Sequence, residues 1–320
     1  MKIILIGPGN KNIPPKGWGA CESIVWDYYL NLQKRSIDVE FISEPSADKI
    51  IQICNEKNPD IVHIMYDNYY SVAPQLKCSR IFLTTHFAYI THPQFATFVK
   101  SAPYFRSIFS PTIAMQRNYK LIALSDEVAD VYKRHGFDEA RILVLRNGAR
   151  EDIFKYNDTP SKADKSVYVA KIEARKCQYK YQSIDSIDFV GNYHPNSSFE
   201  KSNPNYLGEW TKPVLYNSLT EYGNLILLSN GEADPLVVKE ALMSGLGVVV
   251  SECSKSNLDL SKDFITVIPN SKLDDLDYVR QQINKNREIC KLKRAEIREY
   301  ALSVFSWDVI VTEYLQLISK

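Results

Sequence analysis

Two glutamates separated by seven residues, Glu232 and Glu240, flank the start of a predicted helix. Glu232 lies in the loop before this helix and Glu240 lies within it, so the two carboxylates could contact different parts of one elongated ligand. Pro235 suits the first turn of a helix, where the backbone N–H groups of Leu236 and Val237 would lack partners within the helix. Such groups can bind a phosphate. Ordinary complementation of the helix dipole by acidic residues is the alternative.

A glycine-containing turn follows the first predicted strand. It begins at Gly7, contains Gly17 and Gly19, and leads into the first predicted helix at Glu22. It does not match the dinucleotide-binding fingerprint, because position 12 is Asn12, and it lacks the Gly-Lys-Ser/Thr of a P-loop. Small residues before a helix let backbone N–H groups approach an anion closely, and an ordinary glycine-containing loop remains the alternative.

Length and composition set broad limits on the protein class. The chain has 320 residues, 45% hydrophobic and 24% charged, which excludes a disordered, collagen-like or coiled-coil protein. The length suits two domains of roughly 150 residues each. The 39 Lys and Arg residues nearly balance the 38 Asp and Glu residues, so a dedicated nucleic-acid-binding protein is not expected.

The chain shows no secretion or membrane signal. The first apolar run is too short for a signal peptide, and no stretch approaches 18 apolar residues. The six cysteines have the spacing of neither a disulfide framework nor a zinc site. We therefore expect a cytoplasmic protein with reduced thiols.

Predicted strands and helices alternate along the chain. Apolar runs predict strands at 2–6, 39–42, 60–65, 80–85, 120–124, 142–145, 166–170, 187–190, 224–228, 247–250 and 264–268. Helical spacing predicts helices at 24–32, 47–57, 126–135, 233–244, 274–303 and 307–318. Alternation of this kind indicates parallel sheets covered on both faces, and the polar stretch 156–165 is the best candidate linker between two domains. Ligands of such folds bind beyond the carboxyl ends of the strands.

Together the motifs resemble retaining nucleotide-sugar glycosyltransferases of the GT-B fold, glycosyltransferase family 4. The signature of that family is Glu, seven residues and Glu, followed by a helix and a small-residue strand entry, as in 232–250. Further landmarks occur in the family's order at 17–22, 59–63, 84–86, 123–126, 146–149 and 305–308, so the resemblance covers nearly the whole chain.

The resemblance implies an α/β protein with two doubly wound, parallel-sheet (Rossmann-like) domains facing a cleft. Residues 1–157 would form the acceptor-side domain, and a C-terminal helix at about 305–320 would pack back on it. Residues 158–304 would bind the donor.

Individual roles follow from the same resemblance. Glu240 would bind the ribose hydroxyls of the donor, and Glu232 would bind hydroxyls of its sugar. His86, after a strand, would orient donor sugar and acceptor, although a lone histidine there is more often structural. His63 lies within a strand and is expected in the core. The other predicted donor-binding residues are Gly17, Gly19, Arg175, Asp234, Pro235, Leu236, Val237, Gly191 and Glu209.

Lys171 and Lys176 align with the two cations, five residues apart, that hold the diphosphate in the family. Two cations would stabilise the negative charge that develops on the leaving nucleoside diphosphate. The family's arginine is Lys171 here, and its glycine is Ala170. Lysine cannot make bidentate contacts, and Arg175 is a candidate substitute. We therefore predict His86, Glu232, Lys171 and Lys176 as catalytic residues.

The resemblance predicts a metal-independent, hexosyltransferase-like enzyme of polysaccharide biosynthesis that retains configuration. The donor would be a nucleotide-sugar such as a UDP- or GDP-sugar, and the acceptor a glycan, a lipid-linked molecule or a small molecule. We interpret Asp275-Leu276-Asp277 as a helix cap rather than a metal site. A sugar-nucleotide epimerase and a non-catalytic sugar-nucleotide binder are the alternatives.

Two segments bear on membrane contact. The aromatic stretch 86–109 and the basic run 285–298 allow peripheral contact with the inner membrane face. Packing into the core and a solvated helix face, respectively, are the simpler interpretations.

Overall fold

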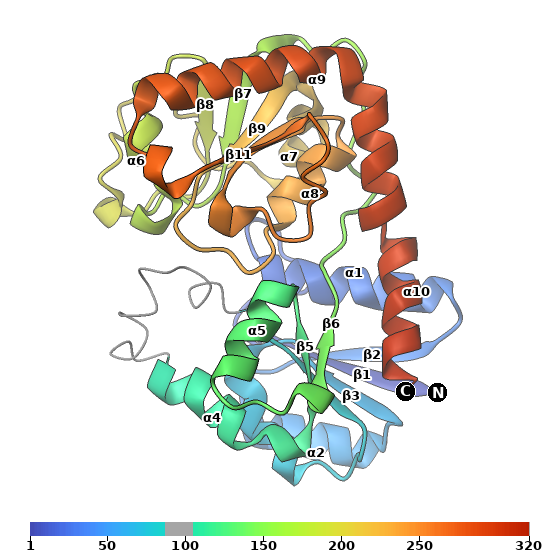
Figure 1. The fold of residues 1–320 in the computed structure, drawn as a ribbon. Helices are drawn as coiled ribbons and strands as arrows, with labels where there is room; N and C mark the ends of the chain where they lie inside the picture. Colours follow the sequence, from blue (N-terminus) through green and yellow to red (C-terminus); the bar gives the residue numbers. More distant parts are fainter. Residues whose placement is uncertain (87–104, 320) are drawn as a thin grey trace. The chain divides into compact units, whose positions relative to one another are not determined.

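The computed structural model describes residues 1–86 and 105–319. The chain divides into two compact units (Figure 1). The first unit comprises Met1–Asn147 and Trp307–Lys320, and the second comprises Gly148–Ser306. Each unit contains one parallel sheet, built from the apolar runs that the sequence pattern predicts as strands.

In the first unit the strands pair in the order β2-β1-β3-β4-β5-β6, and every pair is parallel. The strands are β1 (Lys2–Gly7), β2 (Asp38–Ser43), β3 (Ile61–Ile64), β4 (Ile81–Thr84), β5 (Lys120–Ala123) and β6 (Ile142–Val144). The helices are α1 (Ala20–Lys34), α2 (Ala47–Lys57), the 3₁₀ segment η1 (Asp67–Gln75), α4 (Ser110–Ala114), α5 (Asp126–Arg134) and α10 (Trp307–Ile318). The strand order reverses between β1 and β3, because β2 lies on one side of β1 and β3 on the other.

The C-terminal helix α10 packs within the first unit (Figure 1). The ring of Tyr28 on α1 lies 4.9 Å from that of Trp307 and 5.0 Å from that of Tyr314. His63 on β3 is fully buried beneath this contact, with its Nδ1 3.1 Å from the Tyr314 hydroxyl and its Nε2 2.6 Å from Oγ1 of Thr84. The prediction that His63 is a core residue is therefore confirmed.

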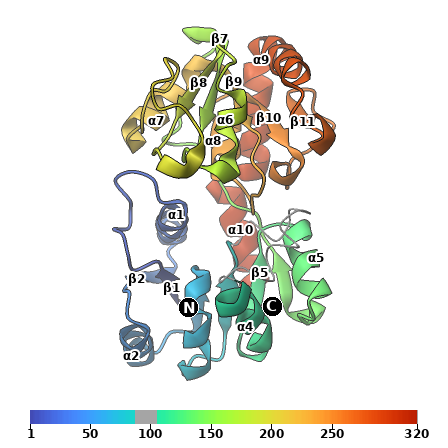
Figure 2. The same ribbon diagram turned by 90° about the vertical axis from the view of Figure 1, so that its left-hand side faces the viewer.

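In the second unit the strands pair in the order β11-β10-β9-β7-β8, again all parallel. In Figure 2 these strands follow one another across the unit, with β7 between β8 and β9. The strand order reverses between β7 and β9. The strands are β7 (Lys162–Val169), β8 (Ile187–Val190), β9 (Tyr222–Leu227), β10 (Gly247–Ser251) and β11 (Ile265–Ile268). The helices are α6 (Gln178–Tyr181), α7 (Lys212–Ser218), α8 (Leu236–Met243) and α9 (Leu276–Phe305).

The basic run on α9 is a solvated face only in part, because Lys285 is exposed and Lys291 and Lys293 are partly exposed, whereas two of its arginines are buried. Arg287 and Arg294 are only 7% and 3% exposed. The guanidinium of Arg294 donates to the carbonyl oxygens of Asn157, Tyr222 and Thr220 at 2.6–3.0 Å, so backbone dipoles offset part of the cost of burying its charge. These arginines lie on the helix face whose apolar members are Val279, Ile283, Cys290 and Ile297.

The predicted strands are all present, with differences at their ends and in the connections. The predicted linker 156–165 runs directly into β7, which starts at Lys162, and residues 148–157 group with the second unit. Within the aromatic stretch, Phe109 is buried and its ring lies 4.8 Å from that of Tyr132. Its other aromatic residues Phe87, Tyr89, Phe95, Phe98 and Tyr104 lie outside the described residues. None of the helices in 1–86 and 105–319 combines the length and the apolar character needed to span a bilayer.

Candidate functional site

Charged side chains gather in the second unit where β7 and β9 end. Lys171, Arg175 and Lys176 follow β7, while Ser229 and Glu232 follow β9. Because β7 and β9 are parallel neighbours, the loops at their carboxyl ends meet at one edge of the sheet. This is also the position at which the strand order reverses, where open α/β sheets typically bind ligands.

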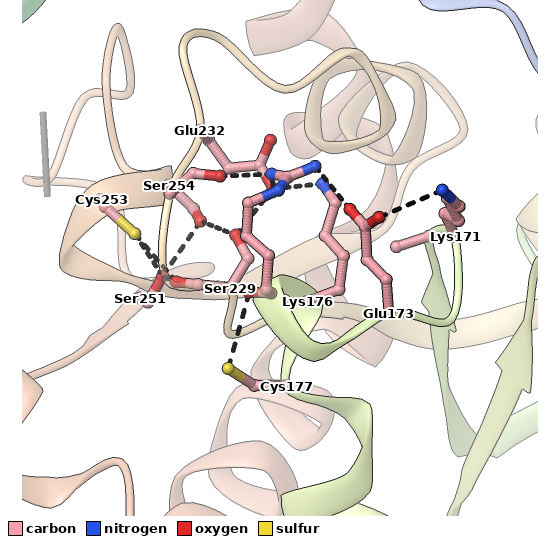
Figure 3. A network of polar contacts seen from close by, with 12 residues as sticks. Lys171, Glu173, Lys176, Cys177, Ser229, Glu232, Ser251, Cys253 and Ser254 are labelled. Atoms are coloured by element: carbon pink, nitrogen blue, oxygen red, sulfur yellow. Dashed lines mark hydrogen bonds and ion pairs between the residues drawn. The ribbon is translucent and has the colours of Figure 1, made fainter. Parts of the chain in front are cut away.

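Glu232 is the centre of this group and is 7% exposed (Figure 3). Its Oε1 accepts a hydrogen bond from the Ser229 hydroxyl at 2.7 Å, and it pairs with the ammonium of Lys176 and, at 3.4 Å, with Arg175. Burial alone would raise the pKa of Glu232, but Lys176 and Arg175 outweigh it and hold that pKa below its ordinary value. Burial lowers the pKa of Lys176, and the Glu232 carboxylate offsets part of this effect. Glu232 is therefore an ionised, fixed carboxylate.

A second carboxylate connects the remaining cations. Oε1 of Glu173 accepts from the Arg175 guanidinium at 2.8 Å, and its Oε2 lies 3.3 Å from the Lys171 ammonium (Figure 3). We call Lys171, Glu173, Arg175, Lys176 and Glu232 the cationic cluster, since its three cations and two carboxylates sum to a formal charge of +1. The structure thus brings the predicted residues Lys171, Arg175, Lys176 and Glu232 together. The sequence analysis did not predict Glu173, although its position between Lys171 and Arg175 could have indicated that it pairs with them.

The N-terminus of α8 lies in the same connection as Glu232. Pro235 precedes the helix, and no side chain caps it, so the first backbone N–H groups, including those of Leu236 and Val237, have no capping side chain. The nearby carboxylate of Asp234 points instead to the buried ammonium of Lys239, and it also accepts a hydrogen bond from Asn257 at 2.9 Å.

Glu240 lies on α8 itself. Its side chain is partly exposed, and burial raises the pKa of its carboxyl group. Lys212 and Lys239 act in the opposite direction.

Two further predicted donor-binding residues lie beyond β8. Gly191 has φ +153°, and a Cβ atom there would lie 1.8 Å from the carbonyl oxygen of Ala170, so only glycine fits this close approach. Its N–H donates to the Gly208 carbonyl at 2.9 Å, which joins two loops at the edge of the sheet. Glu209 is exposed and accepts a hydrogen bond from Asn192 at 2.8 Å.

The remaining predicted residues belong to the first unit. Gly19 precedes α1, and its carbonyl accepts from the N–H and the hydroxyl of Ser23 at 3.0 and 2.8 Å. Gly17 lies in the partly exposed loop before it.

His86 directly follows β4 and Thr85 in this unit, and its backbone N–H donates to Oδ2 of Asp67 at 2.8 Å. Burial lowers the pKa of the His86 imidazole to about 4, so the ring is neutral near pH 7. Its Nε2 has no hydrogen-bond partner among the described residues. Sequence reasoning missed Asp67, which follows β3, the strand next to β4.

Within the described part of the chain, Asp275 acts as a helix cap rather than as part of a metal-binding group. Residues 1–86 and 105–319 contain no group of three His, Cys, Asp or Glu side chains that could hold a metal ion. Asp275 accepts a hydrogen bond from the N–H of Tyr278 at 3.1 Å and caps α9, as its position in the sequence predicts.

Solved structures with a similar fold are numerous, although no family profile and no curated protein sequence matches the chain. Sucrose-phosphate synthase from Thermosynechococcus elongatus has a TM-score of 0.78 and 13% identity, over 99% of this chain and 98% of that one. Anabaena HepE, in a complex with UDP and glucose, has a TM-score of 0.72 and 14% identity, over 100% and 99%. The galactosyltransferase WaaB of the lipopolysaccharide outer core has a TM-score of 0.65 and 16% identity, over 99% of both chains.

The chain has the GT-B fold. At these identities the similarity shows the fold alone. Within this GT-B chain, the cationic cluster and the N-terminus of α8 belong to the second unit, while Gly19 and His86 belong to the first.

Proposed function

We propose that this chain is a glycosyltransferase that transfers a sugar from a nucleotide-diphosphate donor to an acceptor. The observation that supports this best is the cationic cluster beside the uncapped N-terminus of α8. Both features attract anions, and both lie where the strand order of the second unit reverses. A diphosphate is the ligand that matches three cations and a row of backbone N–H groups.

The proposed roles divide between the two units. In the second, Lys171, Arg175 and Lys176 bind the diphosphate, Glu240 binds the ribose, and Glu232 binds hydroxyls of the donor sugar. The first unit provides the acceptor side, where neutral His86 orients the reacting groups. The neighbours in complexes with UDP and glucose or with UDP-glucose support this choice of donor class.

The proposed reaction retains configuration and uses no metal ion. The bond between the anomeric carbon and the diphosphate breaks, and the acceptor oxygen forms a bond to the same face of that carbon. The acceptor proton passes to a phosphate oxygen of the leaving nucleoside diphosphate. The cations stabilise the charge that develops on this leaving group, which is the task a divalent metal ion performs in other transferases.

The test begins with binding of UDP, GDP and ADP, measured as a rise in melting temperature, because a ligand that binds the folded state stabilises it. Transfer is then assayed with sugar derivatives of the nucleotide that binds, and Lys176→Ala and Glu240→Ala should each abolish most of it. Lys291→Ala, which removes a lysine paired with Asp164 on the surface of the same unit, is the matched control and should retain activity.

Three results would contradict the proposal. Absence of binding for all three nucleotides excludes the donor class, and full activity of Lys176→Ala excludes the site. Conversion of the donor sugar without an acceptor would indicate an epimerase instead. Activity in the presence of a chelator tests metal independence, and the anomeric configuration of the product tests retention.

A further inference from the structure

Glu173 holds the position that a bound anion would take between two cations of the cluster. Its carboxylate oxygens contact different cations, Arg175 at 2.8 Å and Lys171 at 3.3 Å. One carboxylate that bridges two cations has the same pattern of contacts as a phosphate group, which also presents two oxygens to separate donors. Two of the three cations that the proposed function assigns to the diphosphate are therefore already paired with Glu173 within the protein.

The two carboxylates of the cluster differ in how firmly they are held (Figure 3). The side chain of Glu232 is 8% exposed, and it is fixed by the Ser229 hydroxyl as well as by Lys176. The side chain of Glu173 is 21% exposed, and among the described residues its partners are Lys171 and Arg175. Rotation of Glu173 toward water would therefore leave no buried charge unpaired, whereas rotation of Glu232 would.

We propose that Glu173 is an internal anion that occupies Lys171 and Arg175 in the free protein and is displaced when the donor diphosphate binds. This inference rests on the proposed function and adds a residue that controls it. Displacement changes the formal charge offered to the ligand from +1 to +2, which matches one charge on each of two phosphates.

Two consequences follow for the reaction. The donor must compete with Glu173, so its affinity is lower than the three cations alone would give. After transfer, Glu173 returns to the cations and favours release of the nucleoside diphosphate. Glu173 is thus a positioning residue that acts through the two cations, and it takes no part in bond formation.

The experiment measures the affinity of Glu173→Gln for UDP, GDP and ADP by calorimetry, beside the wild type. Glutamine keeps the size of the side chain and removes its charge. The variant should bind the cognate nucleoside diphosphate about two- to fivefold more tightly, the upper part of the range for loss of one partly exposed charge interaction. Its product-inhibition constant should fall by the same factor, while affinity for the parent nucleoside, which has no phosphate, should not change.

The matched control is Glu288→Gln, which removes a carboxylate paired with Lys291 on the surface of α9 and changes the net charge equally. It should leave diphosphate affinity within twofold of wild type. The difference between Glu173→Gln and wild type should also shrink at high salt, because salt screens the competing charge.

The opposite sign would overturn the inference. If Glu173 only orients Arg175 for the ligand, Glu173→Gln and Glu173→Ala will bind the diphosphate more weakly than wild type, and an unchanged affinity also excludes competition. These results differ from failure of the proposed function, in which the wild type itself binds none of the three nucleoside diphosphates.

Discussion

The ammonium of Lys239 and the carboxylate of Asp234 form an ion pair in which both side chains are completely buried. The pair links α8 to the loop before it, and Asn257 donates a further hydrogen bond to the same carboxylate. A buried charge that loses its partner is strongly destabilising, whereas an apolar pair of similar volume is often neutral. The Asp234 carboxylate therefore connects the loop before α8 to the first turn of that helix.

We expect Lys239→Met to lower the free energy of unfolding by about 3–5 kcal/mol, because the buried Asp234 carboxylate loses the ammonium that neutralises its charge. The double variant Asp234→Leu/Lys239→Met should regain most of this loss. Urea unfolding of both variants measures the difference. Lys291→Met, at an exposed ion pair, is the control and should cost less than about 1 kcal/mol. Equal losses in the single and double variants would show that the charge pair is not the cause.

Nucleoside-diphosphate affinity should fall at alkaline pH, because burial holds the pKa of Lys176 below its usual 10.5. The ammonium binds the anion, so affinity is present below this lowered pKa and is lost as pH rises through it. Glu232 raises the pKa of Lys176, so Glu232→Gln should shift the loss to lower pH. Lys176→Arg, which stays ionised, should flatten the profile. Measurement of nucleoside-diphosphate affinity between about pH 7 and pH 10 tests this prediction. The same pH dependence in wild type, Glu232→Gln and Lys176→Arg would contradict the role of Lys176.

Stability should decrease in acid because burial lowers the pKa of His63 to about 3, whereas its usual value is 6.5. The neutral imidazole is favoured in the folded state, so its contribution is present above pH 6.5 and is lost as pH falls toward 3. Each pH unit in this window should cost about 1.4 kcal/mol.

The free energies of unfolding of wild type and His63→Gln at about pH 7.5 and pH 5 measure this dependence. Between these two pH values the variant should lose about 2 kcal/mol less than the wild type. The absolute stability of the variant will be lower, because it lacks the contact with Tyr314, so the comparison concerns the slope alone. His194→Gln, at an exposed position, is the control and should keep the wild-type slope. The same slope in wild type and His63→Gln would contradict the assignment.

Gly191 and Gly208 can be compared to separate the effect of close packing on stability from the effect of backbone conformation. At Gly191 an added Cβ would overlap the carbonyl oxygen of Ala170, whereas at Gly208, with φ +76°, it meets nothing within 4 Å. Gly208→Ala should therefore lower the free energy of unfolding by about 1–2 kcal/mol, the penalty for a non-glycine residue in the left-handed conformation. Gly191→Ala should lower it several times more. Thermal unfolding separates the two, and Gly191→Ala should also weaken nucleotide binding. Equal costs would mean that the contact with Ala170 relaxes easily.

Most strands of both sheets could be predicted because they are short apolar runs that become buried, whereas β2, β6 and the first half of β7 stay partly exposed. Ile3–Ile6 and Val248–Val250, for example, are 0% exposed. The segments that were missed lack this signal. η1 mixes Asp67 and Asn68 with tyrosines and contains Pro74, and α7 is only 7 residues long.

The sequence named Lys171, Arg175, Lys176 and Glu232 of the cationic cluster, but it did not predict the contacts among them. Lys176 and Glu232 are 56 positions apart, and they meet only because β7 and β9 are neighbours in the sheet. The sequence pattern does not determine this neighbour relationship, because both strands are similar apolar runs. The burial of Arg287 and Arg294 could have been predicted from the sequence. The two arginines are seven residues apart, so they share a helical face with the apolar residues Ile283, Cys290 and Ile297.

The position of α10 has a consequence for synthesis of the protein. The rings of Trp307 and Tyr314 complete the core contact with Tyr28, yet a ribosome adds them only after the whole of Gly148–Ser306 has been translated. The second unit is continuous in the chain, so all of its residues are present before α10 is synthesised. The first unit begins earlier in the chain and is completed later, so Tyr28 lacks these two ring contacts until α10 has been synthesised.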